Sequence, residues 1–369
     1  MTGSILTYLD HLGQKTMEEM PFNDVDALIL CQLAYLKYDG QVPDVDEDLP
    51  PIGLEKLAAS PRMELLFTDE RFGRMNRELF LRVIKSRRFR GIRAGAYVNL
   101  IEKDWETQFA AITLYLGENV RFVAFRGTDE HVVGWKEDFN MAILYPIPAQ
   151  HCALKYVRVM AERIDCPFYL GGHSKGGNLA IYAAMHAQPQ IQAKIIKTYN
   201  MDGPGFRPEV LELDAYDRIE DRVVKILPHS SIIGMLFEQD TRRIVVESAG
   251  LGLWQHDPYS WMVEEDHFLE AKGIGEGRQF LNETLREWME SLTEEEIRTL
   301  RDALFGILEA SKARDLIELG HDKKKSMTGM LEAARELEPE TVNMIKEALG
   351  RLCEVTGERA LRKIGTWKK

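Results

Sequence analysis

The stretch Phe168–Ala184, FYLGGHSKGGNLAIYAA, limits what this chain can fold into more than any other. A short apolar strand, Phe168–Leu170, runs into a glycine-rich turn, and an alanine-rich helix is expected from about Asn178. Residues Gly172–Gly176 fit the pattern G-x-S-x-G, which forms a nucleophile elbow between a strand and a helix. Because glycines leave room for the sharp turn, the pattern predicts that the Ser174 hydroxyl projects above a sheet.

The helix after the serine supplies a second part of this prediction. Its first turn has unpaired backbone N–H groups and a partial positive charge, so the N–H of Lys175 can hold a developing oxyanion. The alternative is a glycine-rich turn in an ordinary α/β sheet, with Ser174 as a helix cap. The flanking strand, the helix and the further glycine at Gly177 favour a serine hydrolase.

Length and charge narrow the class of protein. The 369 residues suffice for one large domain and an appendage. A net charge of -12 argues against nucleic acid or an anionic membrane as a partner held by bulk charge. The sequence shows neither a secretory signal nor a bilayer-spanning apolar stretch, so we expect a cytoplasmic protein without stable membrane insertion.

The cysteines indicate neither a disulfide framework nor a zinc site, because they are scattered and form no C-x-x-C pair. They are Cys31, Cys152, Cys166 and Cys353. We expect no cofactor and no metal, and a small-molecule or lipid ester as substrate. The sequence does not indicate an oligomeric state.

Short apolar strands alternate with helices through the middle of the chain. Besides the elbow strand, strands are expected at Phe109–Leu116, Val120–Phe125, Lys194–Asn200, Val223–Leu227 and Arg243–Ser248. Helices are expected from Asp24 to Leu36, capped by Asn23, and at His151–Ile164. The alternation predicts an α/β fold with a mostly parallel central sheet flanked by helices.

From about residue 277 the sequence has a helical pattern. Thr293 and Glu296 form a capping-box pattern. Further helices are expected at 322–337, 339–354 and 356–365. We therefore predict an α/β domain over residues 1–276, N-terminal helices included, and a C-terminal helical segment over 277–369 that packs on or beside it.

A serine nucleophile needs a histidine base, and five histidines follow Ser174. They are His186, His229, His256, His267 and His321. His256 is the chosen base, because it follows the last strand in a segment rich in aromatic residues. His186 lies inside the elbow helix, His267 in an acidic surface turn and His321 in the helical tail, while His229 also follows a strand.

Asp202 is the chosen acid, since it ends the strand after the elbow helix and precedes Gly203–Gly205, which can form a tight loop. Asp257 adjoins His256 in sequence, so its side chain is expected to point elsewhere. The loop Pro228–Gly234 offers no carboxylate. The alternative role for Asp202 is a hydrogen bond to its own loop backbone.

Thr128 is the second candidate for the oxyanion hole, beside Lys175. It follows a central strand and can offer its N–H and its hydroxyl, and Asp138 can orient that hydroxyl.

These residues resemble the class-three, or fungal-type, lipases. Phe125–Thr128, followed by Trp135 and Asp138, resembles that family's F-R-G-T/S…W..D segment, in which the Thr or Ser is the oxyanion residue. In that family the acid lies in the loop corresponding to Pro228–Gly234, where this chain has Ser231, and the histidine lies in an Asp-His segment that Asp266–His267 imitates. The acid and base are therefore not carried over. Lys175 is also unusual there, and its cation can favour an anionic acyl group or stabilise the local fold.

The chain resembles more closely a bacterial family of uncharacterised lipase-like proteins called Mbeg-like. The matching segments are Phe22–Asp26, Asp202–Phe206, Ser230–Leu236 and Gln255–Pro258. The resemblance covers about residues 20–265 and extends to the helical tail. It implies an α/β-hydrolase fold and a lipase-like serine hydrolase with no assigned substrate.

The first functional hypothesis is a carboxylic-ester hydrolase that acts through Ser174, His256 and Asp202. An acyltransferase is a close variant, in which an alcohol instead of water accepts the acyl group. The second hypothesis is a non-catalytic binding protein that retains the fold, which the missing acid in Pro228–Gly234 and the unusual Lys175 would support.

Overall fold

The computed structural model describes residues 2–69, 72–102, 104–129, 137, 140, 141, 144–236, 243–311 and 337–366. By their internal contacts, the residues form two compact units. The first comprises Met1–Asp129 and Pro148–Gly275, and the second comprises Glu130–Ile147 and Glu276–Lys369. Residues 130–147, which the sequence analysis assigned to the first domain, thus group with the C-terminal residues. That the C-terminal segment packs on or beside the first domain stays a prediction.

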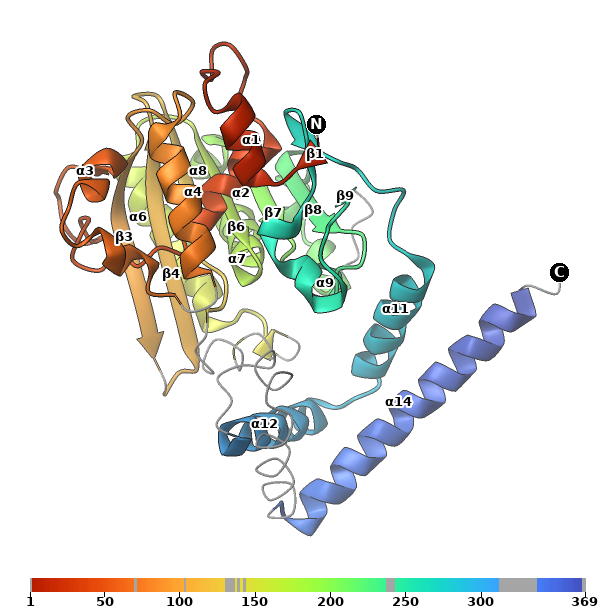
Figure 1. Ribbon diagram of the computed structural model, residues 1–369. Helices are drawn as coiled ribbons and strands as arrows, with labels where there is room; N and C mark the ends of the chain where they lie inside the picture. Colours follow the sequence, from red (N-terminus) through yellow and green to blue (C-terminus); the bar gives the residue numbers. More distant parts are fainter. Residues whose placement is uncertain are drawn as a thin grey trace. The chain divides into compact units, whose positions relative to one another are not determined.

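An eight-stranded sheet forms the centre of the first unit, with the strands in the order β2-β3-β4-β5-β6-β7-β8-β9 (Figure 1). Neighbours from β2 to β5 pair antiparallel, whereas β5 to β9 are parallel. The strands are β2 (Ile52–Gly53), β3 (Arg93–Glu102), β4 (Thr107–Leu116), β5 (Val120–Phe125), β6 (Phe168–His173), β7 (Ile195–Met201), β8 (Val223–Pro228) and β9 (Arg243–Val246). The expected mixed α/β fold with a mostly parallel sheet is confirmed.

Helices cover both faces of this sheet (Figure 1). On one face lie α1 (Ile5–Leu12), α2 (Asp24–Leu33) and α4 (Gly73–Lys85), and on the other lie α6 (Pro148–Arg163), α7 (Lys175–His186) and α8 (Pro189–Gln192). Shorter helices are α3 (Leu54–Ala58), α9 (Pro208–Leu211), α10 (Asp214–Asp217), η1 (Met63–Phe67), η2 (Glu220–Arg222), η3 (Ile233–Met235), η4 (Gly252–His256) and η5 (Pro258–Ser260). A separate three-stranded sheet contains β1 (Thr2–Gly3), β10 (Val263–Glu264) and β11 (His267–Phe268).

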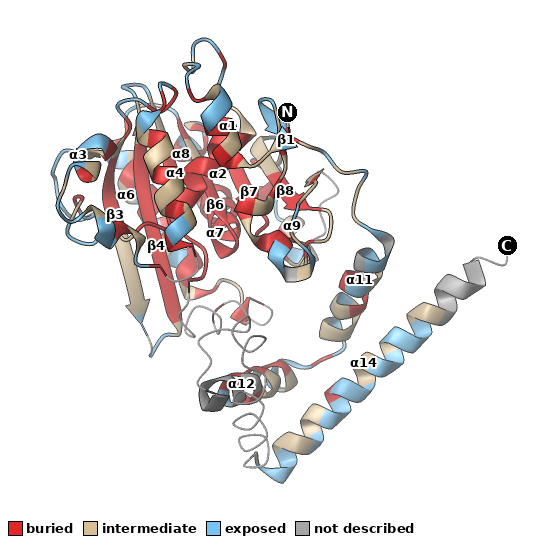
Figure 2. Cartoon of the chain, in the orientation of Figure 1, coloured by how far each residue is buried: buried red, intermediate tan, exposed pale blue. Residues whose placement is uncertain are grey.

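The strand β5 shows why the sheet is buried on both faces. Its side chains alternate, so Phe122 and Ala124 join the core beneath α2, whereas Phe125 packs against Tyr156 of α6 with ring centroids 6.1 Å apart. Figure 2 shows burial concentrated in the central strands and in α7. A run of apolar residues at this position is what a strand covered by helices on both sides requires.

The helix α2 begins at Asp24, as predicted, and its N-terminus is strongly fixed. Asn23 accepts a hydrogen bond from the Asp26 N–H, and the Asp26 carboxylate accepts one from the Asn23 N–H, which completes a capping box. Asp26 is fully buried and also ion-pairs with Arg88. The guanidinium of Arg88 in addition donates to the carbonyl of Met20 at 2.9 Å.

The described part of the second unit contains the long helices α11 (Glu276–Glu290), α12 (Glu294–Ser311) and α14 (Pro339–Thr366). The capping box of Thr293 and Glu296 is confirmed. Two separate helices at 339–354 and 356–365 were expected, but α14 is continuous. Gly357 lowers helix stability without ending it, and the Thr356 hydroxyl donates to Leu352 O within the helix. The predicted helix 322–337 lies outside the described residues.

Among the helices of the described ranges, none combines the length and the apolar character needed to cross a bilayer.

Candidate active site

The turn after β6 has the geometry of a nucleophile elbow. Ser174 has φ 59° and ψ -137°, a backbone conformation that residues other than glycine rarely adopt. Helix α7 begins at the next residue. The expected start near Asn178 was therefore three residues too late. A Cβ on Gly172 would lie 2.2 Å from the backbone carbon of Gly176, so this close crossing of strand and helix needs a glycine.

Asp202 occupies the corresponding place after the neighbouring strand β7. It also has a positive φ, 52°, and it is fully buried. Side chains hold the loop that follows: Asn200 accepts the Gly203 N–H at 2.7 Å, and the Lys225 ammonium donates to Gly203 O at 2.9 Å. Asn178 of α7 donates to Gly205 O at 2.9 Å. The carboxylate is thus fixed by bonds to its flanking backbone.

The structure joins Asp202 to His256. His256 Nδ1 lies 2.7 Å from Asp202 Oδ2, and His256 ends the short helix η4, which follows β9. The other carboxylate oxygen, Oδ1, accepts a hydrogen bond from the Ser231 hydroxyl. The Gly234 N–H in turn donates to Ser231 Oγ at 2.9 Å. Ser231, which stands where the class-three lipases carry their acid, is therefore a hydrogen-bond partner of Asp202.

Burial raises the pKa of Asp202 to about 7, while the Ser231 hydroxyl and the nearby His173 and Lys225 act in the opposite direction. The cause is that a carboxylate without access to water loses hydration, which penalises its charged form. The Ser231 hydroxyl and the Lys225 ammonium therefore favour the ionised carboxylate that can accept the Nδ1–H of His256.

Ser174 lies against both flanks of Asp202. The Ser174 N–H donates to Met201 O at 2.9 Å, and a Cβ on Gly203 would lie 2.2 Å from Ser174 O. His173, directly before the serine, lies with its Nε2 2.9 Å from His256 O. The elbow, the loop after Asp202 and the segment that ends at His256 therefore meet beside the carboxyl ends of β6 and β7. Ser174 and His256 are 8% and 9% exposed, so both are largely buried and keep a small accessible area.

The candidate oxyanion residues flank the same serine. A Cβ on Gly127 would lie 2.8 Å from Ser174 Cβ, which places the segment before Thr128 against the elbow. Lys175 is the first residue of α7, where backbone N–H groups are not used by the helix. Asp138 lies outside the described residues, so its orienting role stays a prediction.

The Lys175 side chain is directed into the protein. It is 1% exposed, and its ammonium donates to Gln108 O of β4 at 3.0 Å. The Gln108 side chain donates to Asp129, which also pairs with Lys37 at 3.0 Å and with Arg126 at 3.3 Å. These bonds favour the local structural role of Lys175 over recognition of an anionic acyl group.

The other histidines of the sequence analysis have different surroundings. His229 Nδ1 lies 3.3 Å from a Glu247 carboxylate oxygen, and His267 is exposed and lies 3.2 Å from Asp266 Oδ1. His186 ends α7, with its ring 4.4 Å from that of Tyr182. His321 lies outside the described residues. Among the described candidates, His256 has its Nδ1 2.7 Å from Oδ2 of the predicted acid, Asp202.

Sequence reasoning missed two polar side chains of this site. For Ser231 the sequence showed the position, which is where the class-three lipases carry their acid, but not the contact with Asp202. That position was the available signal. His173 stands inside the elbow pattern, but nothing local in the sequence indicates that its ring reaches the base segment. In the described ranges, no group of three His, Cys, Asp or Glu side chains is arranged to hold a metal ion.

Comparisons with known proteins identify a matching family and a similar solved structure. The model of the Mbeg1-like family matches residues 83–306. A crystal structure of M37 lipase is similar with 13% sequence identity and a TM-score of 0.35, over 58% of this chain and 69% of that one. No curated protein matches the sequence.

Proposed function

This chain belongs to the Mbeg1-like family, and on that premise we propose that it is a lipase-like serine hydrolase with an α/β-hydrolase fold that cleaves carboxylic esters. The observation that carries the proposal is the 2.7 Å bond between His256 Nδ1 and Asp202 Oδ2, beside a serine with positive φ. A positioned serine, imidazole and carboxylate are the groups that acyl transfer requires.

In the proposed reaction His256 acts as base and then as acid. Its Nδ1–H donates to Asp202, so in the neutral ring Nε2 carries the lone pair that takes the Ser174 proton. Ser174 Oγ forms a bond to the ester carbonyl carbon, and the carbonyl oxygen becomes an oxyanion. When this oxyanion collapses, the bond to the alkoxide breaks, and His256 gives its proton to the leaving alcohol.

Water completes the cycle. It attacks the acyl-enzyme while His256 takes one of its protons, and the carboxylic acid leaves as that proton returns to Ser174 Oγ. The N–H groups of Thr128 and Lys175 are the proposed donors to the oxyanion. Removal of one such donor costs about 10²–10³ in turnover in enzymes of this kind.

The test is hydrolysis of p-nitrophenyl esters of short and long acyl chains by the full-length protein. We expect turnover that Ser174→Ala and His256→Ala abolish, and that Asp202→Asn lowers by about 10⁴, because the wrong imidazole tautomer is then favoured. His267→Ala is the matched control and should behave like the wild type. Its side chain is exposed and pairs with an adjacent aspartate instead.

Two results separate the alternatives. Transfer of the acyl group to an added alcohol, in preference to water, would identify an acyltransferase with the same residues. An absence of turnover on every ester, in protein that is folded by circular dichroism, would contradict the proposal and favour a binding protein.

A further inference from the structure

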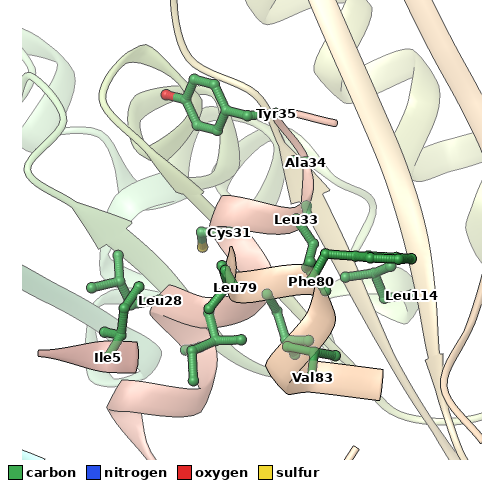
Figure 3. Close-up of a cluster of buried hydrophobic side chains, with 14 of the residues drawn as sticks. Ile5, Leu28, Cys31, Leu33, Ala34, Tyr35, Leu79, Phe80, Val83 and Leu114 are labelled. Carbon is green, nitrogen blue, oxygen red and sulfur yellow. The ribbon is translucent and has the colours of Figure 1, made fainter. Parts of the chain in front are cut away.

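Tyr35 follows α2 and is 1% exposed, with its ring packed edge-on against Phe72 at 5.6 Å. Figure 3 shows this ring directed away from the apolar cluster around Leu79 and Phe80, with the hydroxyl at its far end. That hydroxyl lies 3.0 Å from His173 Nδ1 and 3.4 Å from His173 O. A residue of the N-terminal segment thus reaches the elbow.

His173 in turn contacts the base segment, which is the short helix that ends at His256. Its other ring nitrogen, Nε2, lies 2.9 Å from His256 O, and because a carbonyl only accepts, Nε2 carries the proton. Nδ1 is then the acceptor for the Tyr35 hydroxyl. The rings of His173 and His256 are also close in a tilted arrangement, with centroids 4.6 Å apart and planes inclined by 32°. Both the backbone and the ring of His256 therefore rest on His173.

The Tyr35 hydroxyl also touches the segment that leads to the proposed oxyanion residue. A Cβ on Gly127 would lie 2.5 Å from the Tyr35 oxygen and 2.8 Å from Ser174 Cβ. The hydroxyl is therefore at the point where the end of β5, the elbow and, through His173, the base segment come together. These three segments carry the groups whose relative positions determine the rate of acyl transfer.

We propose that Tyr35, acting through His173, is a positioning residue that holds His256 in register with Ser174. This inference rests on the proposed function. It adds a residue to the site from outside residues 83–306, the part that the family model matches. The N-terminal segment then completes the active site, besides covering one face of the sheet.

The first test is Tyr35→Phe, which removes only the hydroxyl. Tyr38→Phe is the matched control, because Tyr38 is equally buried and its hydroxyl donates to Leu33 O at 3.0 Å, within the same segment. We expect Tyr35→Phe to lower kcat for a p-nitrophenyl ester by about tenfold at unchanged KM, since a misplaced base weakens the transition state more than substrate binding. Tyr38→Phe should retain the wild-type kcat.

The second test is a double-mutant cycle with His173. His173→Leu removes both hydrogen bonds, so adding Tyr35→Phe to it should cause no further loss of kcat. His173→Gln, which can keep an N–H donor for His256 O, should retain more activity than His173→Leu. A purely structural role would instead give additive losses that follow the unfolding free energies.

The outcomes separate this inference from the proposed function. Wild-type protein that hydrolyses no ester overturns both. Active wild-type protein in which Tyr35→Phe matches Tyr38→Phe in kcat, or in which the Tyr35 and His173 losses multiply, overturns the role of Tyr35 and leaves the proposed function standing. A coupled loss confined to kcat supports the inference.

Discussion

Ser174 and Asp202 both adopt positive φ, at 59° and 52°, at the ends of adjacent strands. Each such conformation costs on the order of 1–3 kcal/mol and persists only when its surroundings fix it. Backbone hydrogen bonds fix both residues here. The Ser174 N–H donates to Met201 O, and the Asp202 N–H donates to Ile226 O at 2.8 Å. Strain and polar contacts therefore coincide at the two residues assigned to the chemistry.

Relief of the strain at Ser174 should be measurable as stability. Ser174→Gly and Ser174→Ala both remove the nucleophile, but glycine adopts positive φ without steric cost. We expect Ser174→Gly to have a free energy of unfolding higher than Ser174→Ala by about 1 kcal/mol, after the larger chain entropy of glycine is subtracted. Urea unfolding of the two variants measures this difference, and an equal or lower value for Ser174→Gly would argue against strain.

The environment of Asp202 predicts a pH dependence. Burial raises the pKa of this carboxyl to about 7, and the reaction needs its ionised form, so kcat/KM should rise with pH through that region. The Ser231 hydroxyl lowers the pKa of Asp202, and its removal in Ser231→Ala should therefore move the rise to higher pH. Because Asp202 and His256 are bonded, the profile reports the pair.

Ser230→Ala is the control for that pH profile, since the bond from Ser230 to Gln255 is made by its backbone N–H. Profiles between about pH 5 and pH 9 should be the same for Ser230→Ala and the wild type. A Ser231→Ala profile that also coincides with them would show that the hydroxyl does not tune the acid.

At the scale of elements, α2 has a buried ion pair near its N-terminus and leads at its C-terminus to a residue that contacts the candidate site. Asp26, the partner of the N-cap Asn23 in the capping box, pairs with Arg88, and both side chains are fully buried. Two turns later the chain reaches Tyr35, whose hydroxyl contacts the elbow. The N-terminal segment is thus held in place by a buried ion pair at one end of α2 and reaches the site at the other.

Loss of this ion pair should be costly. Arg88→Met leaves the Asp26 carboxylate buried without its cation, and we expect the free energy of unfolding to fall by about 3–5 kcal/mol. Arg82→Met removes an exposed pair with Asp10, at 2.9 Å, and should cost less than about 1 kcal/mol. Chemical denaturation of both variants tests the difference, and equal costs would contradict the buried role.

The sequence predicted the elements of the sheet well, because their signals are local. Val120–Phe125 is a strand with the expected limits, since its apolar run is bounded by a turn on one side and a polar segment on the other. The start of α7 was misplaced, because Gly176 and Gly177 suggested a longer turn. Both glycines instead lie inside the helix. Glycine is needed at these positions because a side chain there would strike Phe125 or Asn200.

At the scale of the whole chain, residues 130–147 belong to the second unit, although they lie between two stretches of the first. They follow Asp129 and group with 276–369. Within that second unit, Arg301 of α12 donates to Asn140, and Leu144 packs against the cluster formed by Leu292, Ile297 and Ala348. Asn140 and Leu144 therefore contact the C-terminal helices within the second unit.

This coupling predicts a change in amide exchange. Arg301→Met should speed hydrogen exchange of the Leu144 amide, which donates to Asn140 O at 2.7 Å, because the bond from Arg301 to the Asn140 side chain is removed. Arg298→Met, on the same helix, is the control and should leave that amide unchanged. Equal exchange in both variants would show that Arg301 does not order the segment.

Long-range contacts account for what the sequence did not predict. The pattern G-x-S-x-G, the glycines after Asp202 and the aromatic residues around His256 are local signals, and the predictions for these three segments came from them. Tyr35 and His173 are 138 residues apart, and no spacing or periodicity connects them. The grouping of 130–147 with the C-terminal residues likewise depends on contacts that only the folded chain reveals.

The most direct measurement is the site of fluorophosphonate labelling, mapped by mass spectrometry of the digested full-length protein. Labelling requires a serine that a neighbouring base activates, so it tests whether Ser174, His256 and Asp202 act together. We expect one phosphonyl group on the peptide that contains Ser174, present in the wild type and in His267→Ala and lost in His256→Ala. An unmodified Ser174 in folded wild-type protein, or equal labelling of His256→Ala, would contradict this account.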